Sequence, residues 1–195
     1  VASACVLLGG FLAWLVVMTD VPFRRTIGVM ATLPFMIPSF ATSLAWGSLF
    51  RNDRVGGQTG WLHGLGLDLP DWLSWGMVPT LTVLTLHYFS LAFTIIAASL
   101  ATVNSDLVEA AQIAGAKGRR ILLGIVLPVT TPALVAAGSL CFAGAVSNFA
   151  APALLGLPVR MQTLSTRLYG MIEVGQVGRG YVIGILLVVI AALFL

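Results

Sequence analysis

The sequence has very few charged residues. Only 9% of its 195 positions are Asp, Glu, Lys or Arg, whereas 58% are hydrophobic. A soluble domain usually carries about 25% charged residues, so this composition indicates an integral membrane protein. The formal net charge of +3 is small and scattered, with no basic stripe. We therefore expect the chain to lie in a lipid bilayer and to bind no nucleic acid.

The residues that several kinds of chemistry require are also scarce. The only lysine, Lys117, does not belong to a G-x-x-x-x-G-K-[ST] loop, so the chain is not expected to bind ATP by itself. The only histidines, His63 and His87, form no metal-ligand pattern with the only cysteines, Cys5 and Cys141. We expect no enzymatic activity, metal or cofactor in this chain, and packing roles for the two cysteines.

Five apolar segments stand out against the length of about 20 residues that a membrane-spanning helix needs. They cover residues 1–18, 27–50, 77–103, 131–151 and 181–195. The sequence starts and ends inside apolar segments and lacks an initiating methionine, so we expect a fragment of a longer chain. The predicted fold is all-α, a polytopic bundle of membrane helices.

Two connecting stretches are predicted to lie at the membrane surface. Residues 51–76 are rich in glycine and contain Trp61, Trp72 and Trp75, which suit the interfacial belt. Residues 157–180 contain four apolar side chains on one helical face, which predicts an amphipathic surface helix. These four are Met161, Leu164, Leu168 and Ile172.

Two of the apolar segments contain residues that are unusual in a membrane. Pro34 and Pro38 lie on one face of the segment 27–50 and are predicted to kink it, either as a permanent bend or as a hinge. His87 lies near the middle of the segment 77–103. An ionisable residue at that depth is a functional candidate, although a neutral histidine bonded to a neighbouring helix is an alternative.

The longest polar break on one side of the membrane is the stretch Asp106–Pro128, DLVEAAQIAGAKGRRILLGIVLP. Asp106 and Glu109 are spaced as a capping box, which predicts the start of a helix. Leu107, Ala110, Ala111 and Ala114 would share one apolar face of that helix. Gly115 and Gly118 are predicted to end it. A second helical run, residues 119–127, is expected to stop at Pro128.

The spacing of this stretch resembles the EAA loop of ABC importer permeases. The matching positions are Glu109, Ala110, Ala111, Gly115, Ile125, Leu127 and Pro128. In that family the loop docks into a separate ATPase subunit and transmits its movements to the spans. The resemblance therefore implies that these residues couple the chain to an ATPase, and that residues 104–130 form a cytoplasmic coupling loop.

Two further stretches are similar to the ferric iron branch of the family, namely LPFMIPSFATSLAW, residues 33–46, and SNFAAPALLG, residues 147–156. Branches for polyamines, thiamine, sulfate and aminoalkylphosphonates share much of this pattern.

Ser147 also belongs to a run of small residues spaced every four positions, which favours close helix packing. The candidate residues of the solute path are Pro34, Pro38, His87, Ser147 and Asn148.

The resemblance carries several expectations for the whole chain. Residues 1–195 would form one type I ABC transporter transmembrane domain, incomplete at both ends and part of a six-span unit. The protein would lie in a bacterial or archaeal cytoplasmic membrane. Its partners would be ATPase subunits that bind ATP and Mg²⁺, an extracytoplasmic solute-binding protein, and a second permease unit, fused or separate. An ion-gradient-driven transporter without an ATPase is the alternative from another class.

Overall fold

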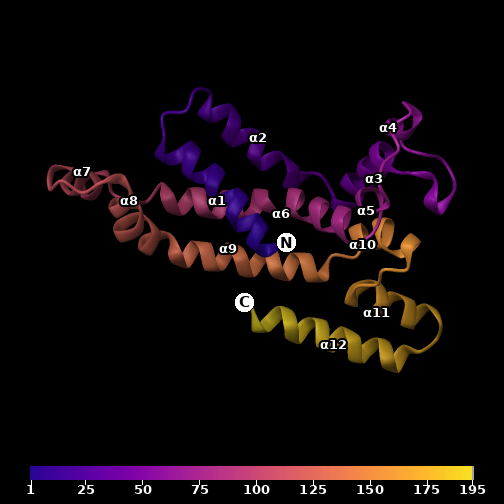
Figure 1. Cartoon of the computed structure of the whole chain (residues 1–195). Coiled ribbons are helices and arrows are strands. Elements are labelled where there is room, and N and C mark those ends of the chain that lie inside the picture. Colours follow the sequence, from indigo (N-terminus) through magenta and orange to yellow (C-terminus); the bar gives the residue numbers. More distant parts are fainter. Residues whose placement is uncertain (195) are drawn as a thin grey trace.

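The computed structural model describes residues 1–194, apart from the side chain of Ser105, and every regular element within them is a helix. Two long antiparallel helices, α6 (Met77–Leu100) and α9 (Leu127–Ser147), lie side by side along an elongated molecule (Figure 1). Between them the chain forms two short helices, α7 (Ser105–Ile113) and α8 (Gly118–Ile121), which project beyond the bundle. We call the end of the molecule formed by α7 and α8 the loop end.

The first helix, α1 (Ala2–Met18), packs against α6 and α9 through a stripe of small residues spaced every four positions. These are Cys5, Gly9 and Ala13, all buried. A Cβ at Gly9 would lie 2.7 Å from both the carbonyl oxygen of Phe89 and the amide nitrogen of Phe93, so the two backbones approach too closely for any side chain. Such contacts are how helices associate without a hydrophobic driving force between them. Cys5 and Cys141 are both free and buried in this core, which agrees with the predicted packing roles.

The predicted second span, residues 27–50, is two helices rather than one. These are α2 (Arg24–Met36) and α3 (Ser39–Phe50), and they meet at an angle of 96°. The ring of Pro38 disfavours the helical conformation at the residue before it, and Ile37 is extended at φ −85° and ψ 123°. The paired prolines therefore produce a break, with Pro34 inside α2 and Pro38 immediately before α3.

The predicted fourth span, residues 131–151, was wrong at both ends. One continuous helix covers Gly118–Ser147, and it contains the five-residue π-helical segment η2 (Leu122–Val126) between α8 and α9. Pro128, expected to stop a helix, lies in the first turn of α9. Because proline lacks an N–H and its ring collides with the carbonyl four residues earlier, the wider π turn lets the helix continue past it.

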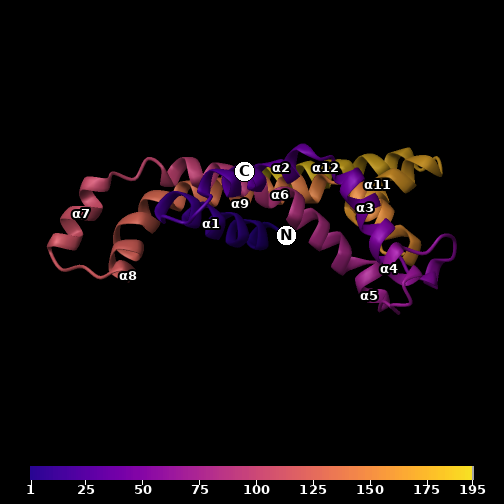
Figure 2. The same cartoon turned by 90° about the horizontal axis from the view of Figure 1, so that it is seen from above.

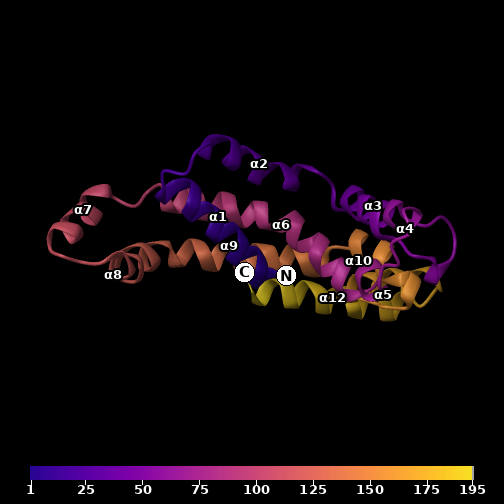
Figure 3. The same cartoon turned by 45° about the horizontal axis from the view of Figure 1, so that its top comes forward.

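The end opposite to the loop end, which we call the far end, gathers α3 with the short helices η1 (Asp53–Val55), α4 (Trp61–Gly64) and α5 (Asp71–Ser74) (Figure 3). Trp61 and Trp72 are exposed there, as an interfacial position requires. Trp75 does not fit that prediction, because it is buried and its Nε1 donates to Asn52 Oδ1 at 2.8 Å.

The chain leaves the far end through α10 (Ala150–Leu155), η3 (Leu157–Val159), α11 (Leu164–Glu173) and α12 (Val177–Leu193), which runs alongside α9. The predicted amphipathic helix is present as α11, but its apolar side chains cover α12 rather than only a membrane surface. A Cβ at Gly180 would lie 2.9 Å from Cγ1 of Ile172, and one at Gly184 would lie 3.7 Å from Cδ1 of Leu168. Met161 precedes the helix and does not belong to its face.

By length and composition, two helices can cross a membrane, Asp71–Leu100 and Gly118–Ser147, or three if the bent pair α2–α3 counts as one span. The helices α1 and α12 are shorter and apolar. Together these are the five apolar segments predicted from the sequence, with the changes described above.

Candidate functional site

The first four residues of the predicted coupling loop, Glu109, Ala110, Ala111 and Gly115, lie on α7 and in the turn after it. The capping box predicted from Asp106 and Glu109 is not formed, because the helix starts earlier. Asn104 is the N-cap, and its Oδ1 accepts a hydrogen bond from the amide nitrogen of Asp106 at 2.8 Å. Glu109 thus lies past the first turn, where its carboxylate cannot reach the cap residue. The Glu109 side chain is exposed and makes no hydrogen bond within the described part of the chain.

Gly115 ends α7 as predicted. Its φ of +80° is in the left-handed region that glycine adopts without strain. The amide of Gly115 donates to the carbonyl of Gln112 at 2.9 Å, and that of Ala116 donates to the carbonyl of Ala111 at 2.9 Å. These two bonds form the Schellman motif, which satisfies carbonyls at a helix end. Gly118 was wrongly predicted to share this role, since it is the first residue of α8.

The two sides of α7 differ in what they contact. Val108 and Ala111 are half-buried and pack against the buried apolar core. On the other side Leu107 is 55% exposed and Ile113 is 89% exposed, and Ala110 beside them is also exposed. The predicted apolar face is therefore divided, because Ala111 belongs to the buried side. The exposed side is an apolar surface next to the free carboxylate of Glu109.

The other three positions that match the EAA loop, Ile125, Leu127 and Pro128, lie on the continuous helix Gly118–Ser147. Ile125 is half-buried and packs against the core. Leu127 and Pro128 are exposed. Thr130 and Thr131 donate to the carbonyls of Val126 and Leu127 at 2.9 and 2.7 Å, which adds hydrogen bonds beside the proline. The loop is thus joined to α9 without a flexible break.

The candidate path residues lie together around the α2–α3 break, with Ser147 at the edge of the group. The ring of His87 is buried and lies 5.4 Å from the ring of Phe35, the residue after Pro34, measured between centroids. Its other aromatic neighbour is Tyr88, at 4.8 Å. Nδ1 of His87 is buried and has no hydrogen-bond partner among the described residues, so the expected bond to a neighbouring helix is not formed by that nitrogen.

Asn148 joins four helices at the point where α9 ends. Its Nδ2 donates to the hydroxyl of Ser39 on α3 at 2.9 Å and to that of Tyr88 on α6 at 3.4 Å. Its Oδ1 accepts from the amide of Ala151 on α10 at 3.2 Å, and its carbonyl accepts from the Ser165 hydroxyl on α11 at 2.9 Å. We call this network the Asn148 junction. Ser147 beside it is exposed, and its hydroxyl bonds back to the carbonyl of Ala143.

Tyr88 completes the Asn148 junction from α6. Its hydroxyl donates to the carbonyl of Gly144 at 2.9 Å, and a Cβ at Gly144 would lie 2.7 Å from the Tyr88 ring. Gly144 and Cys141 of α9 thus contact Tyr88 of α6, and neither belongs to the predicted run of small residues that includes Ser147.

Four participants were missed from the sequence: Asn104, Ile113, Ser39 and Tyr88. The first carries a usable signal, since asparagine is among the favoured N-cap residues and a helical pattern follows it. Tyr88 and Ser39 carry no such signal, because Asn148, to which both are bonded, lies far from each of them along the chain.

Comparison with known proteins establishes the family of the chain. Residues 5–195 match the family described as the binding-protein-dependent transport system inner membrane component. That match covers almost the whole chain, so the chain belongs to this family of ABC importer permeases.

Individual relatives are more distant. The chain is 27% identical over 146 residues to PhnU of Salmonella typhi, described as a 2-aminoethylphosphonate transport system permease, with 71% of this chain and 48% of the relative covered. It is 27% identical over 171 residues to the sulfate transport system permease protein cysT of Marchantia polymorpha, with 85% and 56% covered. It is 32% identical over 128 residues to the galactooligosaccharides permease GanP of Bacillus subtilis, with 64% and 30% covered. The chain thus spans about half the length, or less, of the curated relatives it matches.

Proposed function

We propose that this chain is a membrane-spanning permease subunit of an ATP-binding cassette importer, and that α7 docks onto a separate ATPase. The observation that carries the proposal is the exposed apolar side of α7, with Ile113 89% exposed beside Ala110 and Glu109. Apolar side chains that remain exposed on a helix outside the membrane spans are typical of an interface with another protein. Lys117, Arg119 and Arg120 line a hollow next to it, which favours an acidic surface on the partner.

The proposed mechanism uses the continuity of Gly118–Ser147. A helix of 30 residues joins the loop end to the Asn148 junction, where α3, α6, α10 and α11 meet. A displacement of the docked loop would therefore move the end of α9 and the helices bonded to it as one body. The 96° break at Pro38 gives α2 and α3 separate directions next to that junction. ATP and Mg²⁺ would be bound by the partner subunit, which supplies the free energy for the movement.

Co-purification tests the docking surface directly. A tagged full-length permease is expected to carry a stoichiometric ATPase from its native membranes, and Ala110→Trp is expected to remove it because the indole would separate the two surfaces. The matched control is Ala136→Trp, at an exposed position on α9 remote from the loop. Retention of the ATPase by Ala110→Trp, or equal loss from both variants, would contradict the proposed interface.

For the solute, we propose a small oxyanion in preference to ferric iron. The descriptions of two relatives name 2-aminoethylphosphonate and sulfate, and none of the relatives reported above names iron. Ferric iron is the solute that the stretches 33–46 and 147–156 favour. Uptake of labelled sulfate, 2-aminoethylphosphonate and ferric iron by proteoliposomes that contain the whole transporter would separate them. Uptake of iron alone would overturn the preference.

The alternative, a secondary transporter, is favoured by one observation. Nδ1 of His87 is buried and has no hydrogen-bond partner among the described residues, and an ionisable residue at membrane depth is a candidate for a proton or substrate site. In that case uptake should collapse on addition of a protonophore and persist without an ATPase. Uptake that needs ATP and survives the protonophore would exclude it.

A further inference from the structure

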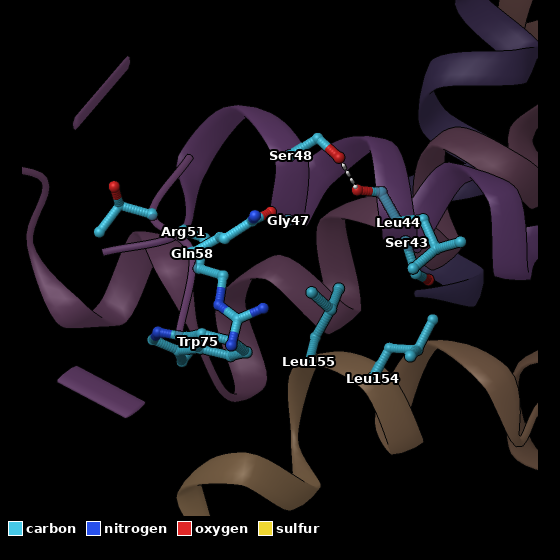
Figure 4. Close-up of a pocket in the computed structure, with 10 residues that line it drawn as sticks. Ser43, Leu44, Gly47, Ser48, Arg51, Gln58, Trp75, Leu154 and Leu155 are labelled. Carbon is cyan, nitrogen blue, oxygen red and sulfur yellow. Dashed lines mark hydrogen bonds between the residues drawn. The ribbon is translucent and has the colours of Figure 1, made fainter. Parts of the chain in front are cut away.

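The far end contains a polar cavity that the coupling loop and the Asn148 junction do not include. It has a volume of about 340 Å³ and lies between α3, the loop that follows it and α10 (Figure 4). Polar residues lining it are Ser43, Ser48, Arg51, Gln58 and Thr59. Leu154 and Leu155 of α10 line it from another side, Leu44 lies beside Ser43 on α3, and Trp75 lies beneath the arginine.

Arg51 is the only charged residue among those that line this cavity. Its guanidinium lies over the ring of Trp75, 5.2 Å from the centroid, and its Nη2 donates to the carbonyl of Gly56 at 2.9 Å. Nε of Arg51 is buried and has no hydrogen-bond partner within residues 1–194. No carboxylate of the described chain lies within 4.0 Å of the guanidinium, whereas the nearby Arg54 is paired with Asp71 at 2.5 Å. A guanidinium held in place without a counter-ion is ready to receive an anion.

The backbone around Arg51 is shaped to keep other side chains out. Gly60 donates its amide to the carbonyl of Arg51 at 2.6 Å, which closes the loop back onto the end of α3. A Cβ at Gly60 would lie 2.7 Å from the amide nitrogen of Arg51. A Cβ at Gly57 would lie 3.0 Å from Nη2 of Arg51, and its φ of +82° also favours glycine. Both glycines therefore let the loop backbone lie directly against Arg51.

We infer that this cavity is a binding site for an oxyanion such as sulfate, phosphate or a phosphonate group. The planar guanidinium matches the oxygens of such a group. Gln58 and Thr59 also line the cavity, and their side chains carry an amide and a hydroxyl that can donate. The phosphate of a lipid headgroup has the same chemistry, and the apolar side chains of Leu44, Leu154 and Leu155 would suit the acyl chain of such a lipid.

Binding to the purified full-length protein in a maltoside detergent tests the site without ATP or a partner. Sodium sulfate is the probe, titrated against sodium chloride at constant ionic strength, and the readout is tryptophan fluorescence. Because Trp75 lies against Arg51, sulfate is expected to change the emission with saturation, and Trp75→Phe is expected to remove that change. Arg51→Gln should weaken binding at least about tenfold, since hydrogen bonds to charged groups are strong. Arg54→Gln, whose arginine is already paired with Asp71, should leave binding unchanged.

A second variant separates recognition from loop folding. Gln58→Leu leaves the contacts of Arg51 with Gly56 and Trp75 in place, and should weaken sulfate roughly three- to tenfold through the loss of a neutral donor. Mass spectrometry of extracted lipids tests the other source of the oxyanion, the phosphate of a lipid headgroup. Stoichiometric phosphatidylglycerol that is retained by the wild-type protein and lost from Arg51→Gln would show that the oxyanion is a lipid phosphate.

Saturable sulfate binding that depends on Arg51 would show a free oxyanion. The inference is overturned if sulfate does not bind and lipid retention is the same in both proteins, or if Arg51→Gln binds sulfate as the wild type does. A role for this site in solute entry rests on the proposed function, whereas binding to the detergent-solubilised protein does not. If the ATPase fails to co-purify but sulfate binds normally, the proposed function is refuted, together with the role of this site in solute entry, while the binding site itself stands.

Discussion

Gly115→Ala and Gly118→Ala add the same methyl group to two glycines three residues apart, and the structure predicts opposite consequences. Gly115 has a φ of +80°, whereas Gly118 is a helical residue at the start of α8. A Cβ at either position would meet no heavy atom within 4 Å, so neither variant has a steric clash. The whole difference therefore comes from the backbone conformation.

The left-handed conformation costs an ordinary residue about 1–2 kcal/mol. In Gly115→Ala this penalty acts on the Schellman bonds that end α7, and about 1.4 kcal/mol corresponds to a tenfold change in an equilibrium. The fraction of loops in the docking conformation should fall by roughly five- to thirtyfold relative to competing conformations. Gly118→Ala should instead favour its helix by about 0.5–1 kcal/mol.

The assay is ATP-driven uptake by the reconstituted transporter, with ATPase activity measured in the same vesicles. Gly115→Ala is expected to lower uptake per ATP hydrolysed, and Gly118→Ala to leave it unchanged. Gly115→Asn is expected to be milder, since asparagine tolerates the left-handed region. Gly115→Asp adds a negative charge that would repel the acidic partner surface proposed above, so it should uncouple hydrolysis from uptake while the protein stays inserted. Equal coupling in Gly115→Ala and the wild type, or an equal loss in Gly118→Ala, would refute the reasoning.

Two further substitutions test the helix contacts. Gly9→Ala should lower the free energy of unfolding by about 1–3 kcal/mol, because its Cβ would lie 2.7 Å from the backbone of α6. The Cβ of Gly10→Ala would lie 3.6 Å from Cδ1 of Ile96 and 4.0 Å from Cδ2 of Leu134, which are ordinary contact distances, so this variant should be neutral or stabilising. Thermal unfolding in detergent compares the two, and equal midpoints would contradict the close α1–α6 approach. Asn148→Asp removes the amide that donates to Ser39 and Tyr88 but keeps the acceptor for Ala151, so it should destabilise by about 1–3 kcal/mol. Tyr88→Phe, which retains the Asn148–Ser39 bond, should cost less.

The sequence predicted those features that depend on neighbouring residues. The helix of α7, its end at Gly115 and the break at Pro38 are all local, since each follows from the backbone preferences of one or two residues. The same reasoning failed where two local rules competed. Pro128 was expected to stop a helix, but the π turn before it absorbs the missing hydrogen bond, and the helix continues for another 19 residues to Ser147.

Contacts between distant residues were beyond that reasoning. Asn148 and Ser39 are separated by 109 positions, and neither has a periodic pattern that would identify its partner. The sequence marked Asn148 only through a resemblance and missed Tyr88, which connects it to Gly144. Cys5 and Cys141 were correctly expected to pack, yet nothing in their spacing indicated that both would donate to carbonyls of the same helix, α6.

The division between local and distant features has a physical consequence for coupling. The loop end can be recognised in a single sequence because its short helix and the glycine turn that ends it each have a local signature, whereas the side of the helix that stays exposed does not. The Asn148 junction depends instead on one side chain whose donors and acceptors meet three other helices, together with a carbonyl that meets a fourth. A neutral amide can make all of these bonds at once, because it carries both a donor and an acceptor group. An ionised carboxylate at this position could only accept, so Ser39 would have to donate instead of accept, and the Tyr88 hydroxyl could bond with it only by giving up Gly144. The long helix that leads from the loop end therefore ends in a connection that a neutral amide makes without disturbing the other bonds of its neighbours, whereas aspartate would change them.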